Sequence, residues 1–246
     1  MIDIHSHILP MVDDGSRTIE MSLKMLDEAY RDGTDELVLT PHLAYPYGFI
    51  NPAEKIKGLF EDFREIVKEA GIPVKLYLGC EYLYRDRDSF EEELEEITTL
   101  NDTRYLLMEF YFNVEGQTIK EAAETVMKHQ LIPVIAHPER YEAIQISDHL
   151  AKDIIDMGGM LQMNKGSISG KYGRMARDTI YELLDHDLIT FIGSDGHDPS
   201  RRNARMYQDY RIISELYGNK RANRIFKENP RRMLQNIDLT KKEIMI

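Results

Sequence analysis

Short apolar segments and longer amphipathic segments alternate about seven times along this chain of 246 residues. The apolar segments have the length and composition of buried strands. We predict strands around Ile2 and Ile4 and over 36–40, 74–78, 105–108, 132–136, 160–163 and 188–192. We predict helices over 18–32, 52–70, 89–97, 118–130, 148–157, 173–185, 202–217 and 220–229. Strands that alternate with helices run parallel and are joined by crossover helices, so the pattern predicts an α/β fold.

The helix predicted after residue 51 carries a start signal. Asn51 is expected to cap it, Pro52 to occupy its first position, and Glu54 follows three residues after the cap.

The length suits one large α/β domain better than two small ones, and we expect a single domain over 1–246. An α/β barrel would place its functional groups at the carboxyl ends of the strands. The rival topology is a doubly wound sheet, which normally binds its ligand near a glycine-rich turn. The sequence contains neither GxGxxG nor GxxxxGK[ST], which favours the barrel.

Composition limits the functions open to the chain. A net charge of −12 argues against general nucleic-acid binding, although a metal cluster could still attract an anionic substrate. The single cysteine, Cys80, excludes an internal disulfide and a cysteine-based zinc finger, and suits the reducing cytoplasm. We find no signal peptide and no segment near the roughly 20 apolar residues of a membrane span. We therefore expect a cytoplasmic protein without membrane insertion.

His5 and His7 stand two residues apart at the end of the first strand, so their side chains point to the same face. Paired imidazoles are a good beginning for a divalent metal site. The alternative is two polar residues at a strand end, each satisfied by hydrogen bonds.

Further nitrogen and oxygen donors follow the other strands. They are His42, Glu81, Glu109, His137, Asp195 and His197, with Asp14 in the loop after the first strand. A barrel would gather all of these at one mouth. About nine donors without a thiolate are too many for one tetrahedral ion, so they suit two or three ions with a bridging carboxylate such as Glu81. The donor types favour manganese, iron or zinc. His129, His149 and His186 lie in or beside helices and are interpreted as surface histidines.

Several motifs together resemble the PHP (polymerase and histidinol phosphatase) family. They are HxH at the N-terminus, PH after the second strand, Glu after the third, HPER, and SDxH near the C-terminus. More narrowly, IDIHSHILPMVDDGS, TPH, GCEY, MEF, AHPERY and GSDGH resemble the manganese-dependent tyrosine phosphatases of bacterial capsule and exopolysaccharide systems. The likeness covers nearly the whole chain. Glu109 stands where many relatives outside the phosphotyrosine branch carry a histidine, which supports the narrower resemblance.

The resemblance implies a distorted (β/α)7 TIM-like barrel with three divalent ions, most often manganese, with iron, zinc or magnesium as alternatives. By matching position, the first ion would take His5, His7, Glu81 and Asp195. The second would take Glu81, Glu109 and His137. The third would take Asp14, His42 and His197, and Asp14 is also counted with the catalytic residues.

The resemblance also implies hydrolysis of a phosphate monoester, in which a hydroxide held between two metals attacks phosphorus. Arg140 and Arg202 are expected to bind the phosphate with their planar guanidinium groups, and Arg201 is not. The alternative is a pair of surface arginines in ion pairs. A tyrosine phenolate leaves easily, since its pKa is about 10. The implied substrate is a phosphotyrosine-bearing protein, the tyrosine-rich tail of a cognate bacterial tyrosine kinase.

Other classes remain as rivals. A PHP small-molecule phosphatase, such as histidinol-phosphate phosphatase, would share the metals and differ in the pocket. A nucleic-acid-processing PHP module and a non-catalytic binding protein on a decayed barrel are less compatible with the charge and with the complete donor set. Cys80 lacks the Cys-x5-Arg spacing of a cysteine phosphatase. Aromatic residues near the strand ends could form a wall for an aryl substrate or merely anchor loops: segment 43–49, Tyr82, Tyr84, Tyr111 and Phe112.

Overall fold

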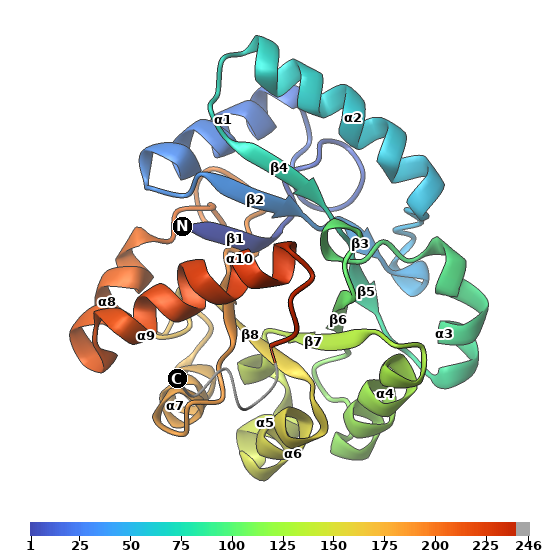
Figure 1. The fold of residues 1–246 in the computed structure, drawn as a ribbon, viewed down its shortest axis with the longest axis vertical. Coiled ribbons are helices and arrows are strands. Elements are labelled where there is room, and N and C mark those ends of the chain that lie inside the picture. Colours follow the sequence, from blue (N-terminus) through green and yellow to red (C-terminus); the bar gives the residue numbers. More distant parts are fainter. Residues whose placement is uncertain (240–246) are drawn as a thin grey trace.

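The computed structural model describes residues 1–239, and in this part of the chain ten helices surround nine strands (Figure 1). The strands are β1 (Ile2–Ser6), β2 (Glu36–Leu39), β3 (His42–Leu43), β4 (Lys75–Leu78), β5 (Glu81–Leu83), β6 (Tyr105–Glu109), β7 (Ile132–Ala136), β8 (Met160–Asn164) and β9 (Phe191–Gly193). The helices are α1 (Ile19–Arg31), α2 (Ala53–Glu69), α3 (Arg87–Glu93), α4 (Gly116–Lys128), α5 (Glu142–Ile146), α6 (His149–Met157), α7 (Arg174–Asp185), α8 (Tyr207–Tyr217), α9 (Asn219–Asn223) and α10 (Asn229–Leu234). A π-helical turn over Arg224–Glu228 joins α9 to α10.

The strands form two parallel sheets, of order β1-β2-β4 and β3-β5-β6-β7-β8-β9. The second and third strand positions are each broken in the middle, at residues 40–41 and 79–80. Their first halves, β2 and β4, pair in the smaller sheet. Their second halves pair in the larger sheet, where His42 lies opposite Glu81. The breaks therefore allow the same two segments to serve both sheets.

Local chemistry explains both breaks. Pro41 has no backbone N–H and cannot continue a ladder of hydrogen bonds. At Gly79 the backbone passes so close to Leu100 that an added Cβ would lie 2.8 Å from its Cδ2 atom. A larger residue there would displace the turn that leads into β5.

The first and last strands also meet. The His7 N–H donates to the Gly196 carbonyl and the Asp195 N–H donates to the His5 carbonyl, both at 2.9 Å. Ser6 and Gly196 form an isolated parallel bridge. The strands thus curl around one interior, with most of the helices outside them (Figure 1).

Alternate residues of the strands fill this interior. The cluster includes Ile2, Ile4, Val38, Tyr105, Leu107, Val134, Met160 and Phe191. The residues between them face outward, so that Leu106 and Met108 of β6 belong to the same buried cluster as Ile119 and Val126 of α4. Burial on both faces is typical of parallel sheets covered by helices.

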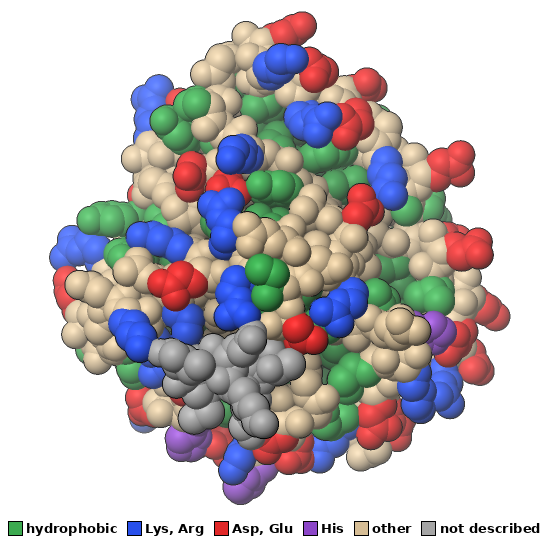
Figure 2. Space-filling model, viewed as in Figure 1, with side chains coloured by type: hydrophobic (Ala, Val, Ile, Leu, Met, Phe, Trp, Pro, Cys, Tyr) green, Lys and Arg blue, Asp and Glu red, His purple; other side chains and the backbone are tan. Residues whose placement is uncertain are grey.

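Helix α10 covers the amino ends of the strands. Its Arg231 forms a two-pronged ion pair with Glu36, the first residue of β2. The Tyr105 hydroxyl, at the start of β6, donates to the Ile237 carbonyl at 2.7 Å. Figure 1 shows α10 in front of β1, and charged side chains of both signs surround this face in Figure 2. The carboxyl ends of the strands open on the other side.

The expected start of α2 is wrong. Pro52 precedes the first helical residue, Ala53, and Asn51 does not cap the helix. Its side-chain amide instead donates to the carbonyls of Val12 and His42, at 2.8 and 2.9 Å, and so ties together two loops at the open end.

Several other element ends differ from prediction. The helix expected over 202–217 begins only at Tyr207, because the Asp198 carboxylate binds the N–H groups of Ser200, Arg201 and Arg202 and holds them in a turn. The strand expected over 188–192 is Phe191–Gly193, because the Leu188 N–H still closes the end of α7. The α-helix expected over 89–97 ends at Glu93, and the last helix continues to Leu234. The short elements β3, β5 and α5 were not predicted.

None of the helices within residues 1–239 combines the length and the apolar character needed to cross a bilayer.

Candidate metal centre

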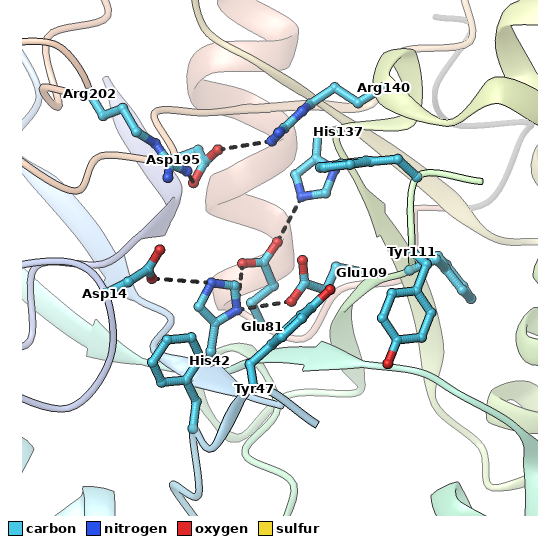
Figure 3. A pocket seen from close by; sticks show the side chains of 13 residues that line it. Asp14, His42, Tyr47, Glu81, Glu109, Tyr111, His137, Arg140, Asp195 and Arg202 are labelled. Carbon is cyan, nitrogen blue, oxygen red and sulfur yellow. Dashed lines mark hydrogen bonds and ion pairs between the residues drawn. The ribbon is translucent and has the colours of Figure 1, made fainter. Parts of the chain in front are cut away.

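Four imidazoles converge on one buried carboxylate. Glu81 opens β5, and its Oε2 atom lies 3.1 Å from Nε2 of both His5 and His7 and 3.3 Å from Nδ1 of His42. Its Oε1 atom lies 2.9 Å from Nε2 of His137. The histidines come from β1, the residue after it, β3 and the residue after β7, so the strand ends assemble the cluster. Figure 3 shows two of them, His42 and His137, on either side of Glu81.

The remaining donors border this cluster. Glu109 Oε1 lies 3.0 Å from His42 Nδ1, and Asp195 Oδ1 lies 3.8 and 3.6 Å from Nε2 of His5 and His7. Asp14 Oδ1 lies 3.5 Å from Nε2 of His42. It also lies 3.3 Å from Nε2 of His197. All nine residues singled out in the sequence therefore lie in one continuous cluster.

Three groups of donor atoms are compact enough to hold a metal ion. Atoms within 4.8 Å of one another come from three sets: His7, Asp14, His42 and His197; His5, His7 and Glu81; His42, Glu81 and Glu109. Glu81, His7 and His42 each belong to two sets. Shared donors of this kind are compatible with neighbouring ions and a bridging carboxylate.

The charges of the cluster are strongly coupled. Burial alone would lower the pKa of His42, but Glu81 and Glu109 outweigh this effect and raise it to about 9. Burial alone would raise the pKa of Glu81, yet the facing histidines hold it well below its usual range. The site therefore keeps carboxylates ionised in a buried place, which favours cations.

Some buried donor atoms of the cluster have no hydrogen-bond partner among the described residues. They are His42 Nδ1, Glu109 Oε1, His137 Nδ1 and His197 Nε2. Unpaired buried polar atoms are costly. At three of these atoms, in His42, Glu109 and His197, the neighbouring groups are also candidate metal donors, and the donor set contains nitrogen and oxygen only. The residues therefore fit divalent cations.

Two further side chains orient the first histidines. Asp13 Oδ2 lies 2.8 Å from His7 Nδ1 and also accepts the backbone N–H of His42 at 3.0 Å. Gln162 Oε1 lies 2.8 Å from His5 Nδ1. Each contact fixes the ring so that Nε2 faces Glu81, the arrangement typical of metal-binding histidines. The sequence reasoning assigned no role to either residue, although a glutamine within the apolar strand β8 is a signal that could have been used.

The backbone is unusual at two donors. His137 has φ 36° and Asp195 has φ 49°, the left-handed region that non-glycine residues rarely adopt. His137 follows β7 directly, and Asp195 lies two residues after the end of β9. The turn of the chain aims His137 at Glu81 and Asp195 at His5 and His7, and the packed strand ends hold both residues in this conformation.

Several of the metal donors line a cavity with a volume of about 470 Å³, and two arginines border it. The Arg202 guanidinium donates to Asp195 Oδ1 at 2.6 Å, and Arg140 Nη1 lies 3.7 Å from Asp195 Oδ2 (Figure 3). Arg140 also lies over the ring of Phe112, 4.3 Å from its centre. Arg201 lines a different cavity.

Aromatic rings form one side of the cavity. Tyr47, Phe49, Tyr111 and Phe112 line it, and the rings of Tyr47 and Tyr111 meet edge to face at 6.0 Å. Phe49 stacks on His42 with ring centres 5.4 Å apart. Tyr82 and Tyr84, by contrast, are core residues, so only part of the sequence-proposed aromatic wall faces the cavity.

The other candidates of the sequence lie outside this site. His129 and His186 pair with Glu91 and Asp148 on helices or beside them, and His149 begins α6. Cys80 is fully buried, and burial raises the pKa of its thiol to about 12. A thiolate nucleophile at Cys80 is thus disfavoured, in agreement with the absence of the Cys-x5-Arg spacing.

Comparisons with known proteins agree with this geometry. The profile of a family described as "Capsular polysaccharide synthesis, CpsB/CapC" matches residues 1–235. The chain is 37% identical over 243 residues to the tyrosine-protein phosphatase CpsB of Streptococcus pneumoniae, covering 96% of this chain and 99% of that protein. It is 30% identical over 238 residues to the tyrosine-protein phosphatase YwqE of Bacillus subtilis, covering 96% and 92%. Its structure matches a chain from the crystal structures of YwqE and CpsB, described as unique metal-dependent tyrosine phosphatases, with a TM-score of 0.87, 27% identity and coverage of 96% and 95%.

Proposed function

The chain belongs to the CpsB/CapC family of capsular polysaccharide synthesis, and we propose that it hydrolyses phosphotyrosine on a protein substrate. Its reaction class is that of its relatives, the metal-dependent tyrosine-protein phosphatases. The observation that carries the proposal is the convergence of four imidazoles on the Glu81 carboxylate in a cavity bordered by two arginines.

We assign nine side chains to three divalent ions. The first ion takes His5, His7, Glu81 and Asp195, the second takes Glu81, Glu109 and His137, and the third takes Asp14, His42 and His197. The contacts of Glu81 with His5, His7 and His137, and those of Asp14 with His42 and His197, support this assignment. His42 Nδ1 also lies 3.3 Å from Glu81 and 3.0 Å from Glu109, which are assigned to the second ion. Manganese is the ion we expect, with iron, zinc or magnesium as the other candidates. Bound ions would supply the attacking water by lowering its pKa, and would offset charge on the phosphoryl oxygens.

Arg140 and Arg202 bind the phosphoryl group in this proposal. Both guanidinium groups contact the carboxylate of Asp195, one of the proposed metal donors. Both arginines also line the cavity. A guanidinium presents two parallel N–H groups that match two phosphate oxygens. Asp14, half exposed at the mouth, completes the catalytic set.

The tyrosine ring of the substrate packs against the aromatic side of the cavity, where Tyr47, Tyr111 and Phe112 are exposed. Exposed aromatic rings beside a phosphate site favour an aryl phosphate over a small alkyl one. The phenolate can leave without protonation, since its pKa is about 10. The chain therefore needs no additional general acid for this substrate.

We extend the proposal to the whole chain. Residues 1–246 form one domain, and its seven strand positions form a distorted barrel; the bridge between Ser6 and Gly196 supports this closure. The partner is the tyrosine-rich tail of a bacterial tyrosine kinase. The location is cytoplasmic, a reducing compartment that suits the free thiol of Cys80.

Turnover of three substrates tests the function. Protein stripped of metal and reloaded with manganese should hydrolyse a phosphotyrosine peptide at least about a hundredfold faster than a phosphoserine peptide, because the serine alkoxide needs a general acid. The same assay is repeated with protein reloaded with zinc, magnesium or iron. A preference for histidinol phosphate would move the chain to the other PHP branch, and a stripped protein that remains fully active would contradict metal dependence.

Asp13 provides a second test. Asp13→Asn keeps the size of the side chain but removes the charge that orients His7, so metal affinity should fall about 10- to 100-fold. Metal titration followed by activity and by bound-metal analysis measures this change. Asp27→Asn, at an exposed position of α1, is the control. Equal metal affinity of the Asp13 variant and the wild type would exclude the orienting role.

A further inference from the structure

A second cavity, of about 390 Å³, lies beside the metal centre. Segments that follow β8 and β9 provide most of its wall. Its charged lining consists of Lys165, Lys171, Arg201, Arg205, Asp32 and Asp209. Cations predominate here although the chain as a whole has a net charge of −12. A cationic cleft on an acidic protein concentrates anions locally.

Within residues 1–239 none of the four cations of this cavity forms a close ion pair, although the charge of Asp209 acts on both Lys165 and Lys171. Lys165 is buried, and its ammonium donates to neutral acceptors, Asn203 Oδ1 at 2.5 Å and the Arg205 carbonyl at 3.1 Å. An ammonium has three N–H groups, so one is left for a ligand.

The two acids of the cavity are already engaged by backbone donors. Asp209 accepts the Gly166 N–H at 2.6 Å, and Asp32 accepts the Tyr207 N–H at 2.7 Å. Their carboxylates hold the loops that form the cavity. The four cations outnumber these two carboxylates, so the lining keeps an excess of positive charge for an external anion.

The second cavity adjoins the first through two pairs of consecutive residues. Arg201 lines the second cavity and Arg202 the first. Lys171 lines the second, and the ring of the next residue, Tyr172, lies 5.0 Å from the Arg140 guanidinium. Burial and then the charge of Arg202 lower the pKa of Lys171, while Asp195, Asp198 and Asp209 raise it.

We propose that this cavity is a second anion subsite, which binds another phosphorylated tyrosine of the same peptide whose phosphotyrosine occupies the metal centre. The inference rests on the proposed function. A phosphotyrosine carries roughly −1.5 to −2 charges and three acceptor oxygens, which several cations can share. An extended peptide advances about 3.3–3.6 Å per residue, so phosphotyrosines a few residues apart can span neighbouring cavities. Binding at one cavity then raises the effective concentration of the other group.

A peptide series tests the subsite on metal-loaded protein. Each peptide carries one hydrolysable phosphotyrosine, and a position three residues away holds a non-hydrolysable phosphonate analogue of phosphotyrosine, Glu, Gln or unmodified Tyr. The series is made with this position on either side. We expect the phosphonate to raise kcat/KM about tenfold over Tyr, because charged hydrogen bonds are worth more than neutral ones. Glu should raise it less, because a carboxylate carries a smaller charge and fewer acceptor oxygens than the phosphonate. No gain on either side would overturn the proposal, and an equal gain from Glu would assign the subsite to carboxylates.

A variant pair locates the effect. In the double variant Lys171→Gln/Arg205→Gln, the ratio of kcat/KM for the phosphonate peptide to kcat/KM for the Tyr peptide should fall close to one. Lys152→Gln removes one charge from an exposed position of α6 that lines neither cavity, and it should keep the ratio. Because each ratio compares two peptides on the same protein, general losses cancel. A full ratio in the double variant would overturn the proposal.

Calorimetric binding to metal-free protein separates this inference from the function. If no metal supports turnover, the proposed function fails, while tighter binding of the peptide with two anionic groups, lost in the double variant, still supports the subsite. Equal binding of the phosphonate and Tyr peptides would overturn the subsite alone.

Discussion

Glu81→Gln should lower kcat/KM for a phosphotyrosine peptide by about a thousandfold, which corresponds to ~4 kcal/mol of transition-state stabilisation. Within residues 1–239, Glu81 is the one carboxylate that contacts His5, His7, His42 and His137 together. Glutamine keeps the shape but replaces an anionic oxygen by an N–H donor that cannot bind a cation. Bound metal per chain should therefore fall along with turnover, and elemental analysis of the purified variant measures it.

Glu93→Gln is the matched control. Glu93 is also a buried glutamate within a polar network, where it accepts from Tyr82 and pairs with Arg85, but it does not line the metal cavity. This variant should lose thermal stability and retain its metal. A Glu81 variant with full metal content and activity would remove the basis of the assignment.

Arg140→Ala should lower kcat/KM about 10²- to 10³-fold while the bound metal stays at the wild-type level. Its guanidinium is held between the rings of Phe112 and Tyr172 and lies near Asp195, so it faces the cavity already oriented. Arg140→Lys should recover only part of the loss, because an ammonium keeps the charge without the planar pair of donors. Steady-state kinetics and elemental analysis on the same preparations separate phosphate binding from metal loss.

Arg85→Ala controls for the loss of a half-buried arginine. Arg85 also pairs with a carboxylate and lies over an aromatic ring, that of Tyr45, but away from the metal cavity. Its replacement should reduce stability and leave the kinetics close to wild type. If Arg85→Ala and Arg140→Ala lose activity equally, the phosphate-binding role of Arg140 is wrong.

The cluster around Glu81 could be predicted from the sequence because parallel strands bring their carboxyl ends together. Once the strands were placed, donors such as His42, Glu109 and His137 had to lie at one end of the fold. The residues that orient the histidines were harder to predict from the sequence. Asp13 stands beside a predicted donor, but its contact with His7 depends on how the loop folds back over β1, and Gln162 meets His5 across 157 residues.

The breaks in the second and third strands were also not predicted. In sequence, residues 40–41 and 79–80 resemble ordinary strand exits, and only the pairing partners show that each chain segment continues in a second sheet. The shift in the start of α8 has a similar cause. A single carboxylate, that of Asp198, binds three successive backbone N–H groups and replaces the first turn of the expected helix.

The meeting of the first and last strands has a consequence for biosynthesis. The Asp3 carboxylate accepts the N–H of Ser194, 191 residues along the chain. At a synthesis rate of roughly 5–20 residues per second, the ribosome needs about 10–40 s to make that span. For most of this time the growing chain contains His5 and His7 but not yet Asp195 and His197. A chain released before Asp195 therefore lacks two of the nine proposed donors, and complete metal binding marks only those copies whose translation went nearly to the end.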